Sequence, residues 1–332
     1  MKVPQKLIIS TSPFLHHRET TPKIMWEVVY TLVPVLLAAF YYFGLSSLLV
    51  SVSAIGGCLL TEWYYGRSTP RGASLKDGSG LITGMLLALT LPPGFPMWMA
   101  FLGGVVAIGA GKIIWGGLGQ NVFNPALLGR AFLQAAFPTA ITTWELPNGH
   151  YFGPRGTNLA MPFFQGTPVD AVSSATPLSQ MKFSHVATAI PDLFMGNTSG
   201  SLGETCALLL ILAGIYLVVR KIINWRIPAA IMLTVGVFSG ILFWINPEKF
   251  ASPLFMFFSG GLLLGSVYMA TDLATSPLSG KGCWIFGISI GLLVVLIRVW
   301  GGLPEGVMYA ILLMNACTPL INKFTQPKVY GH

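Results

Sequence analysis

Charged residues are scarce in this chain of 332 residues: only 9% are Asp, Glu, Lys or Arg, whereas 53% are hydrophobic. This composition supplies too little polar surface for a soluble domain. The apolar runs are long, and they lack the alternating pattern of roughly ten residues that strands of outer-membrane barrels show. Because backbone groups in lipid must find hydrogen-bond partners within their own segment, the runs predict an all-α polytopic membrane protein.

Signatures of soluble catalysis are also missing. The sequence contains neither G-x-S-x-G nor H-E-x-x-H, and the Gly-rich run 116–125 lacks a Walker lysine and the strand–turn–helix setting of a dinucleotide loop. The four cysteines fall in four different apolar runs and form no C-x-x-C pair. His16 and His17 are adjacent instead of one helical turn apart. These absences disfavour a simple hydrolase and a metal or iron–sulfur site built from this chain alone.

The apolar runs predict about ten crossings of the membrane. Two shorter runs, at 79–91 and 122–138, are interrupted by Gly and Pro, which is typical of broken helices. With the amino terminus inside, most of the 19 lysines and arginines fall in cytoplasmic segments, as the positive-inside rule requires. The formal net charge of +8 then reflects orientation in the lipid bilayer, and no nucleic-acid partner is expected.

Five parts make up the predicted organisation. An amino-terminal segment and a carboxyl-terminal tail lie in the cytoplasm, two five-helix repeats span the membrane, and one long loop lies outside. The amino-terminal segment has no apolar core followed by a small-residue cleavage site, so no cleaved signal peptide is expected. In chain order the parts are the segment 1–23, the first repeat 24–138, the loop 139–203, the second repeat 204–322 and the tail 323–332.

Two pairs of segments resemble each other internally. SGLITGMLLALT (79–90) is similar to SGGLLLGSVYMAT (259–271), and WGGLGQNVFNPALL (115–128) is similar to WGGLPEGVMYAILL (300–313). Since five predicted crossings separate the copies, they must run through the membrane in opposite directions. Such inverted repeats with broken helices usually form a shared site near the middle of the bilayer. Chance similarity between Gly-rich apolar segments is the alternative, although the WGGL shared at corresponding positions argues against it.

Charged side chains at membrane depth are costly, and they are candidate functional residues. Glu27 and Glu62 are predicted near the cytoplasmic surface, either as partly hydrated carboxylates or as an entry for Na⁺ or H⁺. Asp272 either caps a helix or lines the inner mouth of an ion pathway. Arg130 is the deepest cation and must meet an anion, a carbonyl group or a cofactor, whereas Lys112 is expected to extend toward the cytoplasmic interface.

The polar run DAVSSATPLSQ (170–180) lies near the middle of the predicted outer loop. Small polar residues and a proline suit an ordinary surface turn. They also suit an attachment site, since a threonine hydroxyl in an accessible loop can accept a phosphoester bond. The residues alone leave both interpretations open.

Three segments together carry a resemblance to a known family. They are DGSGLITGMLLALTLPP (77–93), GKIIWGGLGQNVFNPALLGRAF (111–132) and SATPL (174–178). Over essentially its whole length the chain resembles the D subunits of Rnf electron-transport complexes and, more distantly, the B subunits of Na⁺-translocating NADH:quinone reductases. The resemblance implies about ten transmembrane helices in a 5+5 inverted repeat with broken helices, similar to the architecture of urea transporters.

The resemblance also implies a covalent cofactor. In that family a flavin transferase joins FMN through its phosphate to a threonine in a motif of the form D-x-x-[ST]-G-A-[ST]. Asp170, Ser173, Ala175 and Thr176 match this motif, which nominates Thr176 as the modified residue. Ser174 departs from the pattern because the family usually has Gly there.

The implied protein is a flavoprotein subunit of a redox pump in the bacterial inner membrane, with both termini cytoplasmic and the flavin-bearing loop periplasmic. Such complexes exchange electrons between reduced ferredoxin and NAD while moving Na⁺ or H⁺. The implied partners are the A, B, C, E and G subunits of the Rnf complex and the flavin transferase. A second, noncovalent flavin, riboflavin, would lie nearer the cytoplasmic side, with Asn121, Asn124 and Arg130 as its candidate residues.

Two other functions remain open. A channel or transporter for a small solute fits the inverted repeat and the broken helices equally well, although it gives no role to the SSATP run. A scaffold subunit that has lost its flavin is the other alternative, because Ser174 departs from the attachment motif.

Overall fold

The computed structural model describes residues 20–67, 74–147, 151–162, 175–204 and 206–326. Every regular element in these ranges is a helix. Five helices are long and apolar enough to cross a membrane: α1 (Thr21–Phe43), α2 (Leu45–Gly66), α10 (Arg226–Ile245), α13 (Gly280–Trp300) and α14 (Val307–Phe324). The prediction of an all-helical, multi-pass membrane protein is therefore confirmed.

The other predicted crossings fall on shorter helices. Proline closely follows some of them and ends them early, because it lacks an N–H donor and clashes with the preceding turn. α3, for example, ends just before the run LPPGFP (91–96). The shorter apolar helices are α3 (Ser79–Leu89), α4 (Met97–Ile108) with its π-helical continuation η2 (Gly109–Ile113), α5 (Pro125–Ala136), α9 (Ala207–Val219), α11 (Pro253–Phe258), α12 (Leu262–Leu264) and the π-helical η4 (Gly265–Met269).

Small helices complete the described chain at its connections. They are η1 (Ser74–Asp77), α6 (Pro138–Ile141), α7 (Pro177–Ser179), η3 (Gln180–Ser184) and α8 (Ile190–Met195).

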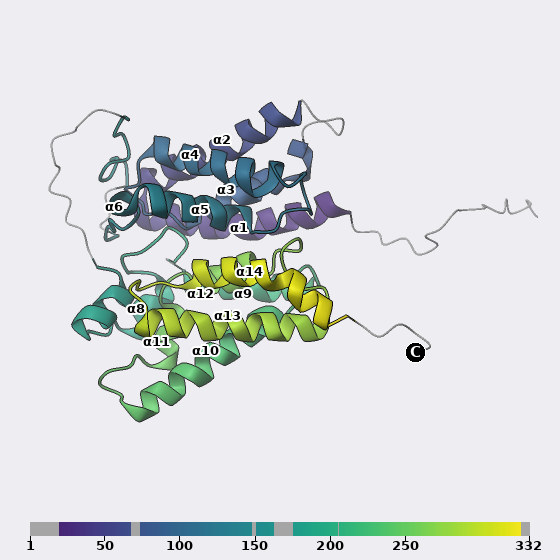
Figure 1. Cartoon of the computed structure of the whole chain (residues 1–332). Coiled ribbons are helices and arrows are strands. Elements are labelled where there is room, and N and C mark those ends of the chain that lie inside the picture. The colour runs from purple at the N-terminus through teal and green to yellow at the C-terminus, as the bar shows by residue number, and fades with distance from the viewer. Residues whose placement is uncertain (1–19, 68–73, 148–150, 163–174, 205, 327–332) are drawn as a thin grey trace, which may run out of the picture.

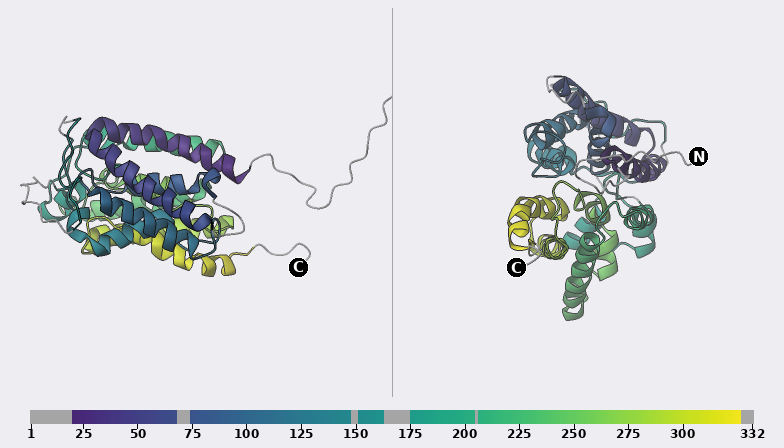
Figure 2. Two further views of the ribbon diagram at one scale, coloured as in Figure 1. Left: turned by 90° about the horizontal axis from the view of Figure 1, so that it is seen from above. Right: turned by 90° about the vertical axis from the view of Figure 1, so that its right-hand side faces the viewer.

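Two groups of helices, α1–α5 and α9–α14, lie side by side with their axes roughly along one direction (Figure 1). In the first group α2 packs against α3 and α4, and α4 packs against α5; in the second, α10 packs against α13 and α13 against α14. The right-hand view of Figure 2 shows the two groups end on, with α1 and α9 among the helices where they meet. We call the end where α1 begins and α14 ends the inner end, and the opposite one the outer end.

The first helices of the two groups run in opposite directions. Arg220 follows the last residue of α9, and its Nε donates to a carboxylate oxygen of Glu27, in the first two turns of α1, at 3.1 Å. The end of α9 therefore lies beside the beginning of α1.

An unwound stretch follows α3, and its backbone groups find partners in the other half of the chain. Leu202 donates its N–H to the carbonyl oxygen of Leu91 at 3.1 Å, and Gly203 donates to that of Leu89 at 2.7 Å. Paired backbone of this kind lets a non-helical stretch persist inside a membrane protein.

Glycines allow α2 and α4 to approach closely. A methyl group on Gly57 would overlap the backbone carbonyl of Phe101, and one on Gly104 would lie 2.5 Å from the carbonyl oxygen of Ala54. Since lipid gives helices little hydrophobic reason to associate, small residues that allow close packing supply much of the contact energy.

We expect Gly57→Ala to destabilise the protein by about 1–3 kcal/mol, because the added methyl forces α2 and α4 apart. The adjacent Gly56 is a matched control, since nothing lies within 4 Å of the methyl that Gly56→Ala would add. Thermal unfolding midpoints of both variants in detergent measure the difference. Equal midpoints would contradict the importance of this contact.

Candidate functional site

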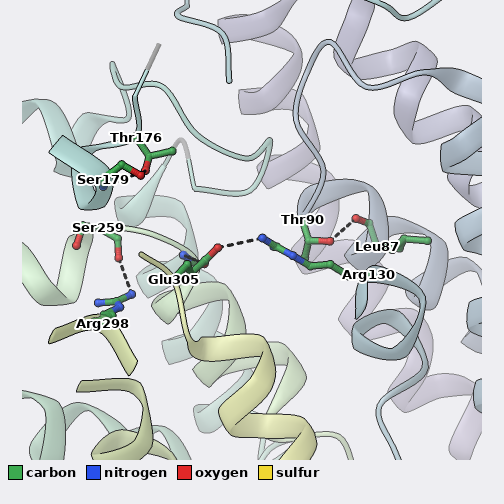
Figure 3. Close-up of polar contacts among 9 residues, drawn as sticks. Leu87, Thr90, Arg130, Thr176, Ser179, Ser259, Arg298 and Glu305 are labelled. Atoms are coloured by element: carbon green, nitrogen blue, oxygen red, sulfur yellow. Dashed lines mark hydrogen bonds and ion pairs between the residues drawn. The ribbon is translucent and has the colours of Figure 1, made fainter. Parts of the chain in front are cut away.

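Thr176 lies at the outer end, where its side chain caps the short helix α7 (Figure 3). Its hydroxyl accepts a hydrogen bond from the backbone N–H of Ser179 at 3.2 Å and donates to the Ser179 hydroxyl at 3.0 Å. Pro177 occupies the first helical position, where its missing N–H costs nothing. The side chain is 8% exposed, so Thr176 is buried, whereas the sequence predicts an accessible hydroxyl. The reason is the capping role, which draws the hydroxyl toward the helix.

The neighbouring motif residues are only partly described. Ala175 is exposed, and its carbonyl oxygen accepts hydrogen bonds from Ser199 at 2.8 Å and Gln180 at 3.3 Å. Asp170, Ser173 and Ser174 lie outside the described residues.

Thr176 lines a cavity of about 70 Å³, the outer cavity, which both groups of helices help to form. Arg130 and Gln134 of α5 contribute to it, and so do Glu204, which precedes α9, and Glu305, which precedes α14. The cavity therefore brings the candidate attachment residue together with ionisable side chains from other parts of the sequence.

Arg130 forms an ion pair across the two halves (Figure 3). Its Nη2 lies 2.9 Å from Oε2 of Glu305, and the other carboxylate oxygen of Glu305 accepts the backbone N–H of Gly261 at 2.7 Å. Gly261 lies in the break between α11 and α12, so Glu305 ties α5 to unwound backbone. Among the described residues, no group bonds the buried Nε of Arg130.

Arg298, near the end of α13, holds the same break from the other side. Its Nη1 donates to the carbonyl oxygen of Met256 at 2.7 Å, and its Nη2 donates to that of Ser259 at 3.0 Å. The Nε of Arg298 and the hydroxyl of Ser259 are buried and have no hydrogen-bond partner within the described part of the chain. Buried polar atoms without partners are uncommon, and a bound ligand is one way to satisfy them.

The structure separates Arg130 from Asn121 and Asn124, which lie at the inner end. Asn124 caps α5, since its side-chain oxygen accepts the N–H of Ala126 at 3.0 Å, and its amide donates to the carbonyl oxygen of Met269 at 3.3 Å. Asn121 donates to a carboxylate oxygen of Asp272 at 3.5 Å. These contacts join the broken segments of the two halves.

Asp272 sits at this junction and also caps a turn. Its carboxylate accepts hydrogen bonds from the N–H of Ala274 at 3.3 Å and the hydroxyl of Thr275 at 3.4 Å. Burial raises the pKa of Asp272, and these hydrogen bonds partly oppose the rise.

Two adjoining cavities at the inner end, of about 100 and 600 Å³, are both lined by Asn121 and Asp272. Asn124 lines the smaller one. Asn315 of α14 lines the larger one; it is buried, and neither atom of its amide has a hydrogen-bond partner within the described ranges. The sequence analysis did not select Asn315, although it is a polar residue within an apolar helix.

Glu62 lies near the inner end, where it forms a buried ion pair with Lys112. Lys112 also donates to the hydroxyl of Ser79 at 2.6 Å. The expectation that Lys112 extends to the interface is therefore wrong, because a buried carboxylate satisfies its charge. Glu27, in contrast, pairs with the half-exposed Arg220 at the surface.

Comparison with known proteins gives full-length matches. The model of the NQR2, RnfD, RnfE family matches residues 8–331. The D subunit of the proton-translocating ferredoxin:NAD(+) oxidoreductase complex of Clostridium ljungdahlii is 39% identical over 97% of this chain and 96% of its own. The D subunit of the ion-translocating oxidoreductase complex of Stutzerimonas stutzeri is 42% identical over 95% of this chain and 93% of its own. The D subunit of the Na(+)-translocating ferredoxin:NAD(+) oxidoreductase complex of Acetobacterium woodii is 37% identical over 98% of this chain and 95% of its own.

Proposed function

The chain belongs to the NQR2, RnfD, RnfE family, and from this membership we propose that it is the D subunit of an ion-translocating ferredoxin:NAD(+) oxidoreductase complex. It thereby takes part in an oxidoreductase that is also a translocase, together with the other Rnf subunits. The observation that carries this conclusion is identity of 37–42% over nearly the full length of D subunits of ion-translocating oxidoreductase complexes, two of which are named as ferredoxin:NAD(+) oxidoreductases.

The proposed cofactor is FMN, joined through its phosphate to the hydroxyl of Thr176 by a flavin transferase. The donor would be a flavin dinucleotide: its phosphoanhydride bond breaks, the nucleoside monophosphate leaves, and the hydroxyl loses its proton as the phosphoester forms. One donor beside Thr176 suits a phosphate oxygen: Arg130 lines the same cavity, and its buried Nε has no hydrogen-bond partner in the described chain. When bound, a flavin supplies electron transfer in steps of one or two electrons. Thr176 supplies the attachment point, and the Nε–H of Arg130 supplies a hydrogen-bond donor beside the phosphate.

Attachment requires the hydroxyl of Thr176 to give up its two hydrogen bonds to Ser179. This change is small, because α7 has only three residues and two hydrogen bonds hold the threonine side chain. The transferase would thus act on the segment before α7 forms or while it is open.

The proposed fold is a 5+5 inverted repeat of ten crossings, similar to urea transporters. The opposite directions of α1 and α9 support it, and so does the matching packing of α2 on α4 and of α10 on α13. The proposed setting is the bacterial inner membrane, with the inner end in the cytoplasm and Thr176 on the periplasmic side.

The inner end is the proposed location of the remaining functions. Asn121 and Asn124 line its cavities and stay candidates for a riboflavin site, whereas Arg130 belongs with Thr176. Asp272, Glu62 and Glu27 lie on the path proposed for Na⁺ or H⁺, with Asp272 at the junction between the halves.

We expect the wild-type chain, produced together with its flavin transferase, to carry flavin that survives denaturation. Ultraviolet-excited fluorescence of the protein band on a denaturing gel, with the intact mass, measures this. A colourless chain whose mass equals that of the polypeptide would contradict flavin attachment and would favour a scaffold subunit or a solute channel.

A further inference from the structure

A second cavity, of about 210 Å³, adjoins the outer cavity. Leu178 and Pro304 line both of them, and Leu178 is only two residues from Thr176. The outer cavity, at about 70 Å³, is the smaller of the two. A phosphate is a compact group, whereas the ring system of a flavin needs the larger space.

Basic side chains line this second cavity, which we call the basic cavity. They are Lys182, His185, Lys249 and Arg298, and its described lining includes no carboxylate. The outer cavity differs, because its one described cation, Arg130, is paired with Glu305, and Glu204 also lines it. The Nε of Arg298 is one of the buried atoms without a partner in the described chain. The basic cavity thus favours a ligand that carries negative charge.

Lys182 fixes the Thr176 segment to the end of α13. Its ammonium group donates to the carbonyl oxygens of Gly301 at 2.5 Å and Leu303 at 2.9 Å, and to that of Ile297 at 3.3 Å. Burial lowers the pKa of Lys182, so an anion nearby would stabilise its charged form. The same residue therefore sets the position of the segment and of one positive charge.

Aromatic rings form another wall of the basic cavity. Trp300 and Phe250 both line it, with their ring centroids 6.4 Å apart. The ammonium group of Lys249 lies 5.7 Å from the centroid of Phe250. Flat aromatic ligands pack well on such surfaces, and cations beside them favour electron-rich rings.

We propose that the basic cavity binds the isoalloxazine ring of the flavin attached to Thr176, with the cations facing the negative charge that reduction places on the ring. The inference rests on the proposed attachment. It assigns the phosphate to the outer cavity beside Arg130 and the ring to the basic cavity, and it makes Lys249 and Trp300 positioning residues that tune the flavin.

Lys249→Gln tests whether positive charge in the basic cavity stabilises the reduced flavin. Lys249 is exposed and makes no hydrogen bond through its ammonium group within the described residues, so its removal should leave the fold intact. We expect the preference for the reduced flavin to fall roughly tenfold, which lowers the midpoint potential by about 30 mV for a two-electron couple. Spectroelectrochemical titration of the full, flavinylated chain measures the potential. Lys281→Gln, an exposed change at the opposite end of α13, is the control and should leave it unchanged.

Trp300→Leu tests the aromatic wall. A ring packed against tryptophan fluoresces weakly, so we expect this variant to raise the fluorescence per bound flavin. Trp244→Leu is the matched control, because Trp244 is 86% exposed at the end of α10 and does not line the basic cavity.

The two proposals fail in different ways. Flavin that is covalently bound but has unchanged potential in Lys249→Gln and unchanged fluorescence in Trp300→Leu would overturn the ring position and leave the attachment standing. A wild-type chain without covalent flavin would overturn both.

Discussion

Replacing Thr176 with Asn is expected to abolish covalent flavin attachment while leaving the local structure in place. Asparagine caps helices as well as threonine does, so α7 keeps its N-cap, but it offers no hydroxyl for a phosphoester bond. The expected result is complete loss of ultraviolet-excited fluorescence from the denatured protein band. Intact-mass measurement should show the unmodified polypeptide.

Thr176→Ser is the matched control for this loss. It keeps both the hydroxyl and the cap, so flavin should remain attached, in a reduced amount if the transferase prefers threonine. Thr176→Ala completes the set: it removes the hydroxyl and also the cap, at a cost of about 1 kcal/mol. Fluorescence that persists in Thr176→Asn would place the attachment on another residue.

Loss of the positive charge at Arg130 should destabilise the protein by about 3–5 kcal/mol. In Arg130→Met the carboxylate of Glu305, whose side chain is only 20% exposed, is left without its counter-ion. The pair also joins α5 to the break between α11 and α12, so the two halves should separate more easily. The unfolding midpoint of the detergent-solubilised chain measures the effect.

A double-mutant cycle isolates the pair itself. Glu305→Gln can still accept the N–H of Gly261, so it tests the charge alone. In Arg130→Met combined with Glu305→Gln, no uncompensated charge of the pair remains, and the loss should be clearly smaller than the sum of the two single losses. Gln134→Met, on the same helix and cavity, is the uncharged control and should cost little. Additive losses would contradict a coupled ion pair.

Much of the fold followed from local features of the sequence. The apolar runs predicted helices because a backbone in lipid has no water with which to bond. Proline and glycine in LPPGFP and NVFNP predicted the interruptions after α3 and before α5, and both occur at those places. The Rnf resemblance rested on segments whose residue order is itself unusual, and the family comparison confirmed it.

Single long helices account for five candidate spans, fewer than the roughly ten crossings predicted. Apolar length alone does not determine helix length. The run after α3 is buried yet unwound. The carbonyl of Leu89, at the end of α3, bonds the N–H of Gly203, and that of Leu91, in the run, bonds the N–H of Leu202, which no local pattern could reveal.

The candidate site was likewise predicted only in part before the tertiary structure was known. The sequence by itself selected Arg130 from its depth, because residue type and position in an apolar run are local properties, whereas the resemblance to the Rnf family nominated Thr176. Only the tertiary structure decided that they share a cavity, that the partner of Arg130 is Glu305, 175 residues away, and that Asn121 meets Asp272, 151 residues away. The physical reason is that a buried charge requires a counter-charge without specifying where it comes from in the chain, and the packing of the two halves supplies it.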